Sequence, residues 1–192
     1  EPFETRRGSR LKALAQYGGR PAFPSIPLGI TPPGAQALAQ VARWPGRAED
    51  PEAPRHAVVL CEGEPDWLSV ADVAAGLDTD LYVVPVGLVA MSHGFAPEFV
   101  GLLEEAERVV CVMDRGRAHP RWEGKTGGQV VVDQIRGLLL EAGRARGEDF
   151  DTCFERVDNM IVEALQPDDR DVNDLHVQGT LGRLIRETLG EL

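Results

Sequence analysis

A short apolar run in this chain is followed directly by acidic side chains. Residues 57–61, Ala-Val-Val-Leu-Cys, are too few for a core helix and too apolar for a half-exposed strand, so they predict a buried parallel strand. Glu62 and Gly63 follow directly, and Asp66 comes one helical turn later. Open α/β sheets bind ligands outside the carboxyl ends of their strands, where a glycine allows a tight turn. We therefore expect Glu62 to lie at an edge suited to chemistry, with Asp66 close by.

Charge is distributed unevenly along the sequence. Residues 108–147 carry eight Lys or Arg and four acids, a net of +4, whereas residues 148–174 carry ten acids and two Arg, a net of -8. A metal-dependent enzyme acting on phosphates needs this combination, because cations hold phosphates and acids hold Mg²⁺. A solvated face explains either patch alone equally well. The net charge of the whole chain, -11, argues against binding nucleic acid by general electrostatics alone.

Three segments together resemble the Toprim domain, which bacterial-type primases, topoisomerases and some nucleases share. The strand followed by Glu62-Gly63 and Asp66 resembles its first motif, and the variant EGEPD is most similar to the primase-like branch. Residues 108–114, RVVCVMD, resemble the second element, a buried strand that ends in an Asp. Residues 165–175, LQPDDRDVNDL, resemble the segment after the last strand in primase-like members. The segments occur in the family's order, with a helix expected between each pair, so the resemblance covers residues 57–190.

The resemblance implies a set of site residues and a divalent cation. Phosphoryl transfer concentrates negative charge, which oxygen-coordinated Mg²⁺ or Mn²⁺ neutralises while aligning the attacking oxygen. By the family pattern, Glu62 is the candidate acid/base. A helix-capping carboxylate is the alternative role for this residue. The expected metal ligands are Asp66, Asp114 and Asp171, with Asp174 further out, and the expected phosphate or nucleic-acid contacts are Arg115, Arg117, Arg121 and Lys125.

Three functions are compatible with this pattern. The first is a primase-like nucleotidyltransferase of DNA replication that joins nucleotides into a primer on single-stranded DNA, with a replicative helicase or further domains of a longer protein as partners. The second is a Toprim nuclease that uses the same acids to cleave a phosphodiester. The third is a degenerate Toprim module that binds without catalysis. Primer synthesis from ribonucleotides separates the first from the second, and absence of Mg²⁺ binding identifies the third.

One departure from the family pattern bears on the third hypothesis. The second acidic motif of the family reads Asp-x-Asp, whereas this chain has Asp114-Arg115-Gly116 and then a longer loop. Gly116 supplies no carboxylate, so binding of two metal ions is in question. Glu123 from the longer loop or Asp133 on the following helix are the residues that can replace the missing oxygen.

Strand and helix signals alternate through the second part of the chain, which predicts an α/β fold. The expected architecture is Rossmann-like and Toprim-like, with about four mostly parallel strands flanked by helices. We divide the chain into a Pro-rich N-terminal segment, residues 1–55, with a short helix at 35–43, and a Toprim-like domain, residues 56–192. Strands are expected at 57–61, 81–86, 108–114 and 160–165. Helices are expected at 65–76, 96–106, 127–142 and 181–189, with Gly143 ending the third of these.

Cysteine usage and hydropathy suggest a cytoplasmic protein that does not interact with membranes. The three cysteines show no C-x-x-C pairing, and Cys61 and Cys111 fall inside expected buried strands, so we interpret them as core residues. No apolar run reaches the 18 residues typical of a membrane span, and there is no secretory signal.

Overall fold

The computed structural model describes residues 3–4, 10–11, 55–88, 95, 97–113, 120–164 and 171–190. Near the N-terminus, β1 (Phe3–Glu4) pairs with β2 (Arg10–Leu11) in an antiparallel register. The helix expected at residues 35–43 lies outside the described residues. None of the helices in the described part of the chain combines the length and the apolarity needed to cross a membrane.

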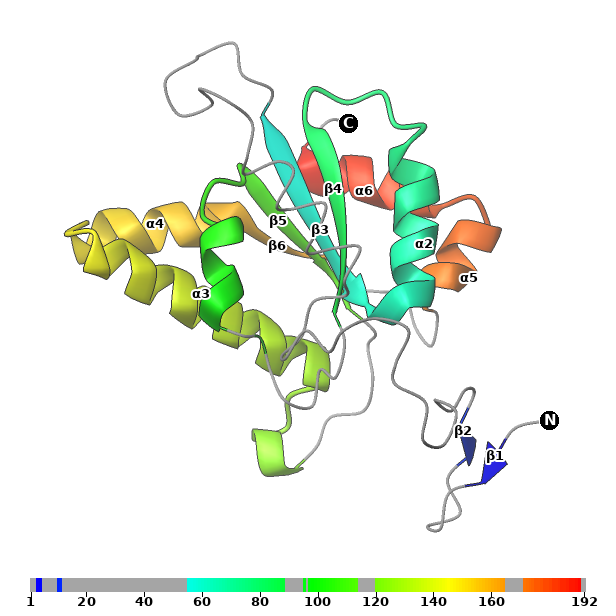
Figure 1. Ribbon diagram of the computed structural model, residues 1–192, viewed down its shortest axis with the longest axis horizontal. Coiled ribbons are helices and arrows are strands. Elements are labelled where there is room, and N and C mark those ends of the chain that lie inside the picture. Colours follow the sequence, from blue (N-terminus) through cyan, green and yellow to red (C-terminus); the bar gives the residue numbers. More distant parts are fainter. Residues whose placement is uncertain are drawn as a thin grey trace.

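A four-stranded sheet forms the centre of the molecule (Figure 1). Its strands are β3 (His56–Glu62), β4 (Tyr82–Leu88), β5 (Arg108–Val112) and β6 (Ile161–Glu163). They lie in the order β4-β3-β5-β6, and all neighbours are parallel. The prediction of an α/β fold with a four-stranded parallel sheet is therefore confirmed. Because every strand runs the same way, the carboxyl ends of all four lie along one edge of the sheet, which we call the carboxyl edge.

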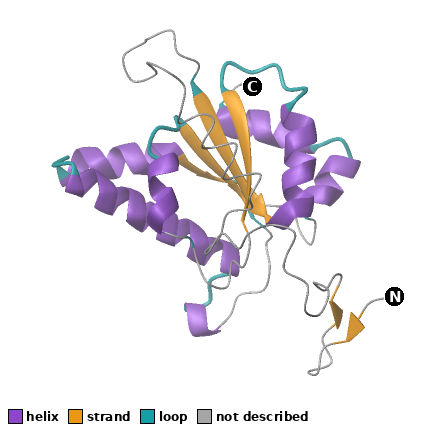
Figure 2. Cartoon of the chain, viewed as in Figure 1, coloured by secondary structure: helices purple, strands orange, loops and turns teal. Residues whose placement is uncertain are grey.

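Helices cover both faces of the sheet (Figure 2). On one face pack α3 (Gly127–Ala145) and α4 (Phe150–Met160), and on the other pack α2 (Gly63–Ala74), α5 (Val172–Val177) and α6 (Leu181–Leu189). Side chains of β3 alternate between the two cores. Val58 and Leu60 join the α3–α4 core, whereas Ala57, Val59 and Cys61 join the α2–α5–α6 core. Burial on both faces explains the unbroken apolar run in the sequence.

Two predicted elements differ from the structure in ways that local geometry explains. β4 continues through Pro85 to Leu88, two residues past the expected end of this strand at residue 86. As an edge strand, β4 has one hydrogen-bonded neighbour, so a missing N–H is tolerated there. The helix expected at 96–106 is instead a 3₁₀ helix, η2 (Pro97–Leu102), followed by turns. Backbone bonds from Leu103 N to Val100 O and from Ala106 N to Leu103 O follow a three-residue period, which also places Leu103 and Ala106 in the core.

The region between α3 and β6 contains a helix that the sequence analysis missed. Gly143 does not end α3, which continues to Ala145, and the chain turns at Gly147, whose φ is +82°. After this turn, Asp149 begins α4 by accepting a hydrogen bond from Thr152 N at 3.0 Å. Because α4 includes Met160, the last strand is shorter than the expected 160–165. All three cysteines are buried, as predicted for core residues.

Candidate functional site

Glu62 and Gly63 form the turn between β3 and α2 at the carboxyl edge. Glu62 is the last residue of β3 and occupies the N-cap position of α2, yet its side chain makes no capping hydrogen bond. The carboxylate is half-buried. Gly63 has φ +72°, a backbone conformation that side chains larger than hydrogen rarely adopt. Glycine is thus required for the turn, and the turn places Glu62 where the sequence analysis expected it, without the helix-capping role that was its alternative.

Asp66 lies on the first turn of α2 and is almost completely buried, with 6% of its surface exposed. Its Oδ1 accepts a hydrogen bond of 2.9 Å from Nδ2 of Asn173, a residue of α5 that is 107 positions away in the sequence. Ser69, three residues after Asp66, donates from Oγ to Oδ1 of the same Asn173. This contact brings the segment of the first Toprim-like motif against the DVNDL segment that follows the last strand.

Asp171 and Asp174 begin α5. Oδ1 of Asp171 accepts from the backbone N of Asp174 at 2.8 Å, and Oδ2 of Asp174 accepts from the backbone N of Asp171 at 3.4 Å. Such a reciprocal capping box satisfies backbone donors that a helix start leaves unpaired. Each carboxylate therefore has a local structural role, and the structure places both on the same short helix as Asn173.

Lys125 lies in the loop before α3, and its Nζ is 2.6 Å from Oδ2 of Asp133 on that helix. This hydrogen bond, together with the negative charge of Asp133, raises the pKa of Lys125 above its ordinary value. Asp133 was one of the two residues considered as a replacement for the missing acid, and it is engaged by this ammonium group. The other, Glu123, is exposed in the preceding turn with φ 54°.

The remaining predicted site residues lie outside what the structure describes. These are Asp114, Arg115 and Arg117, together with Gly116. Arg121 falls within η3 (Pro120–Trp122), but its side chain is also outside the description. Among the described residues, no three His, Cys, Asp or Glu side chains come together in a way that could hold a metal ion. The structure thus brings the segments of the first and last motifs together, and of the second it describes the strand β5 but not Asp114.

Comparisons with known proteins give no further identification. Family models, curated proteins and solved structures were all searched, and none of them matches the chain.

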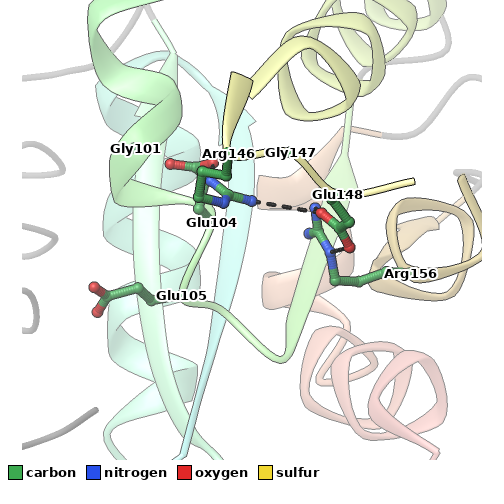
Figure 3. Close-up of a pocket in the computed structure, with 7 residues that line it drawn as sticks. All are labelled: Gly101, Glu104, Glu105, Arg146, Gly147, Glu148 and Arg156. Atoms are coloured by element: carbon green, nitrogen blue, oxygen red, sulfur yellow. Dashed lines mark hydrogen bonds and ion pairs between the residues drawn. The ribbon is translucent and has the colours of Figure 1, made fainter. Parts of the chain in front are cut away.

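A separate cleft of about 720 Å³ lies beside the turn between α3 and α4 (Figure 3). It is lined by Gly101, Glu104, Glu105, Arg146, Gly147, Glu148 and Arg156. Arg156 binds both carboxylate oxygens of Glu148 at 2.9 Å, and Arg146 pairs with Glu104 and, at 3.8 Å, with Glu148. Both arginines thus already have carboxylate partners. The cleft adjoins the residues that lead into β5, away from the carboxyl edge where Glu62 lies.

Sequence reasoning did not identify Asn173 and Ser69 as site residues. Asn173 is part of the DVNDL segment, but we assigned it no role because its amide carries no charge. Ser69 follows Asp66 by three positions, a spacing that puts both on one helix face. That spacing was the available signal.

Proposed function

We propose that this chain is a Toprim-like domain of the primase type, which joins nucleotides on single-stranded DNA with the help of Mg²⁺ or Mn²⁺. The observation that carries the proposal is the hydrogen bond between Asp66 and Asn173. It joins two segments whose separate resemblance to the family came from sequence alone. Their contact at the carboxyl edge of a parallel sheet supports reading them as parts of one site.

The chain's own residues would divide the work as follows. Glu62, half-buried at the strand end, would accept the proton of the attacking hydroxyl group. Asp66, Asp171 and Asp174, with Asp114 from the second motif, would hold the cation. The three described aspartates do not by themselves form a metal site, so the proposal requires Asp114. Their oxygen donors fit Mg²⁺ and Mn²⁺, which prefer hard ligands. When bound, the cation supplies charge neutralisation on the phosphate oxygens. Arg115, Arg117, Arg121 and Lys125 would hold phosphates of the DNA strand or of the nucleotide.

The primase type is preferred over the nuclease type because of the segment after the last strand. Asp171-Val172-Asn173-Asp174-Leu175 resembles primase-like members, and the structure gives this segment a defined place against α2. Nucleotides and single-stranded DNA are accordingly the proposed ligands, the cytoplasm the proposed location, and a replicative helicase the proposed partner.

Primer synthesis on single-stranded DNA tests the proposal. The chain is incubated with labelled ribonucleotides and Mg²⁺ or Mn²⁺, and the products are separated by length. We expect Glu62→Gln to lower the rate by about 10²- to 10⁴-fold, because it keeps the size of the side chain and removes its capacity to accept a proton. Glu155→Gln, at an exposed position on α4, is the matched control and should keep the parent rate.

The same assay distinguishes the other functions. Shortened template strands in place of extended primers would identify a nuclease. No product and no binding of Mn²⁺ would identify a non-catalytic module, the outcome that Gly116 favours. A Glu62→Gln chain with activity within a few-fold of the parent would remove Glu62 from the proposed chemistry.

A further inference from the structure

Asn173 contacts α2 through both ends of its side-chain amide. Nδ2 donates to Oδ1 of Asp66 at 2.9 Å, and Oδ1 accepts from Oγ of Ser69. A carboxylate can only accept, so the NH₂ end of the amide must face Asp66. The carbonyl end then faces the Ser69 hydroxyl. Oγ of Ser69 also lies 3.3 Å from O of Pro65, and a hydroxyl group can donate or accept, so the orientation of the amide follows from Asp66.

The burial of Asp66 makes this orientation important. With 6% of its surface exposed, the carboxylate depends on protein donors more than on water for its direction. An amide donates a hydrogen bond but brings no positive charge. The bond from Asn173 therefore orients the carboxylate without itself adding a positive charge, unlike the bonds from the arginine that binds Glu148 in the cleft near the α3–α4 turn.

We propose that Asn173 is a positioning residue, whose amide holds the Asp66 carboxylate in the direction that divalent-cation binding at the carboxyl edge requires. This inference rests on the proposed function and adds a residue to it. Removal of a residue that hydrogen-bonds to a metal ligand commonly lowers the affinity for the metal by about 10- to 100-fold. Asn173 would act in this way through a contact between helices, with Ser69 hydrogen-bonded to the other end of its amide.

A purely structural role for Asn173 is the alternative, because α5 also docks on α2 through other contacts. Val172 and Leu175 are buried in the core shared with α2. His176, one turn after Asn173, has its Nε2 3.5 Å from Oδ2 of Asp72, one turn after Ser69. His176→Ala removes this second polar contact between the helices without touching Asp66. It is therefore the matched control for docking.

Calorimetric titration of Mn²⁺ into the whole chain, with a melting curve for every variant, tests the inference. Asp66→Asn first establishes whether the binding that is measured uses Asp66. We then expect Asn173→Ala to weaken Mn²⁺ binding by about tenfold or more. Ser69→Ala should weaken it only a few-fold, since Asn173 can still donate to Asp66. His176→Ala should stay within about twofold of the parent even where its melting temperature falls.

Each result has a definite meaning. If Asp66→Asn loses Mn²⁺ binding but Asn173→Ala keeps it, the positioning role is overturned and the proposed function stands. Equal loss in Asn173→Ala and His176→Ala, following the melting temperature, overturns the positioning role in favour of docking. A parent chain that binds no Mn²⁺ overturns the proposed function, and the positioning role with it. Asn173→Ser, whose shorter hydroxyl cannot span to Asp66, repeats the test if the alanine variant does not fold, with the same expected loss.

Discussion

Two contacts between helices, on opposite faces of the sheet, each contain a buried or half-buried carboxylate. The hydrogen-bond donor to the carboxylate is neutral in one contact and positively charged in the other. Between α2 and α5, the structure gives Asp66 a neutral amide as donor. Near the turn between α3 and α4, Glu148 receives two hydrogen bonds from the Arg156 guanidinium, and the pKa of Glu148 is lowered mainly by that contact. Charge opposed by charge stabilises a turn. The Asn173 amide orients the Asp66 carboxylate without adding a positive charge beside it.

The α3–α4 contact is closely packed at Gly143. A Cβ added at Gly143 would lie 2.3 Å from Sγ of the buried Cys153 and 2.7 Å from Oε2 of Glu148. Glycine therefore allows α4 to approach α3 closely, and this is the physical reason for its place inside a helix. We interpret this region as structural and the α2–α5 contact as functional, and the predictions below test that division.

The largest expected effect on stability is at Gly143. Gly143→Ala should destabilise the fold by about 1–3 kcal/mol, because the added methyl group has no room beside Cys153. Gly137→Ala in the same helix is the matched control, since no atom lies within 4 Å of its added Cβ. It should stabilise the chain by about 0.5–1 kcal/mol through helix propensity. Urea unfolding measures both, and Mn²⁺ affinity should be unchanged in each; equal stability of the two variants would show that α4 can move away at little cost.

Two aspartates that cap helices give the next comparison. Asp171 caps α5 beside Asn173, and Asp149 caps α4 at the α3–α4 turn. Asparagine caps about as well as aspartate, so Asp171→Asn and Asp149→Asn should each change stability by only a few tenths of a kcal/mol. Asp171→Asn removes a charge near the proposed cation site and should weaken Mn²⁺ binding several-fold. Asp149→Asn should leave Mn²⁺ binding unchanged. Equal weakening would indicate a diffuse acidic surface with no defined site.

Acid pH should act on the α3–α4 contact. The pKa of Glu148 is lower in the folded chain than its ordinary value of 4.5, chiefly because Arg156 hydrogen-bonds to the charged form. The unfolded chain then binds more protons than the folded chain just below pH 4.5, so the stabilisation is present above that pH and is lost as the pH falls through the folded value. Melting curves of the parent between pH 6 and about pH 3 should show this loss, and Glu148→Gln should show less of it. Identical pH profiles would mean that the contact contributes nothing to folding.

The elements that the sequence predicted well are those whose apolar residues form a simple pattern. β3 and β5 are continuous apolar runs, and α3 carries a clear apolar stripe through Val131, Ile135 and Leu139. α4 was missed because its buried positions, Cys153, Val157 and Met160, are separated by acidic residues that looked like part of an acidic segment. Its N-cap, Asp149, was the signal available.

The candidate site was predicted in part. The position of Glu62 followed from the strand and the glycine after it, which are local features. The contact between Asp66 and Asn173 depends on how α5 docks on α2, and sequence spacing carries no information about a contact across 107 residues. The same limit applies to the pairing of Lys125 with Asp133, which needed the loop conformation before α3.

The smallest expected effect concerns Lys125, the described cation proposed to contact phosphate. Its ammonium group is paired with Asp133, so a phosphate must compete with that carboxylate. Asp133→Asn should leave Lys125 charged at pH 7 and free to contact a strand, and single-stranded DNA should bind about two- to threefold more tightly at low salt. One added phosphate contact should also steepen the dependence of log affinity on log salt by about 0.7. Glu141→Gln is the control, because it removes the same charge from the same helix, and Glu141 forms no ion pair within the described part of the chain. Fluorescence anisotropy over a salt series decides the matter: a steeper slope in Asp133→Asn alone supports a phosphate contact by Lys125, whereas parallel shifts in both variants would reduce the effect to net charge.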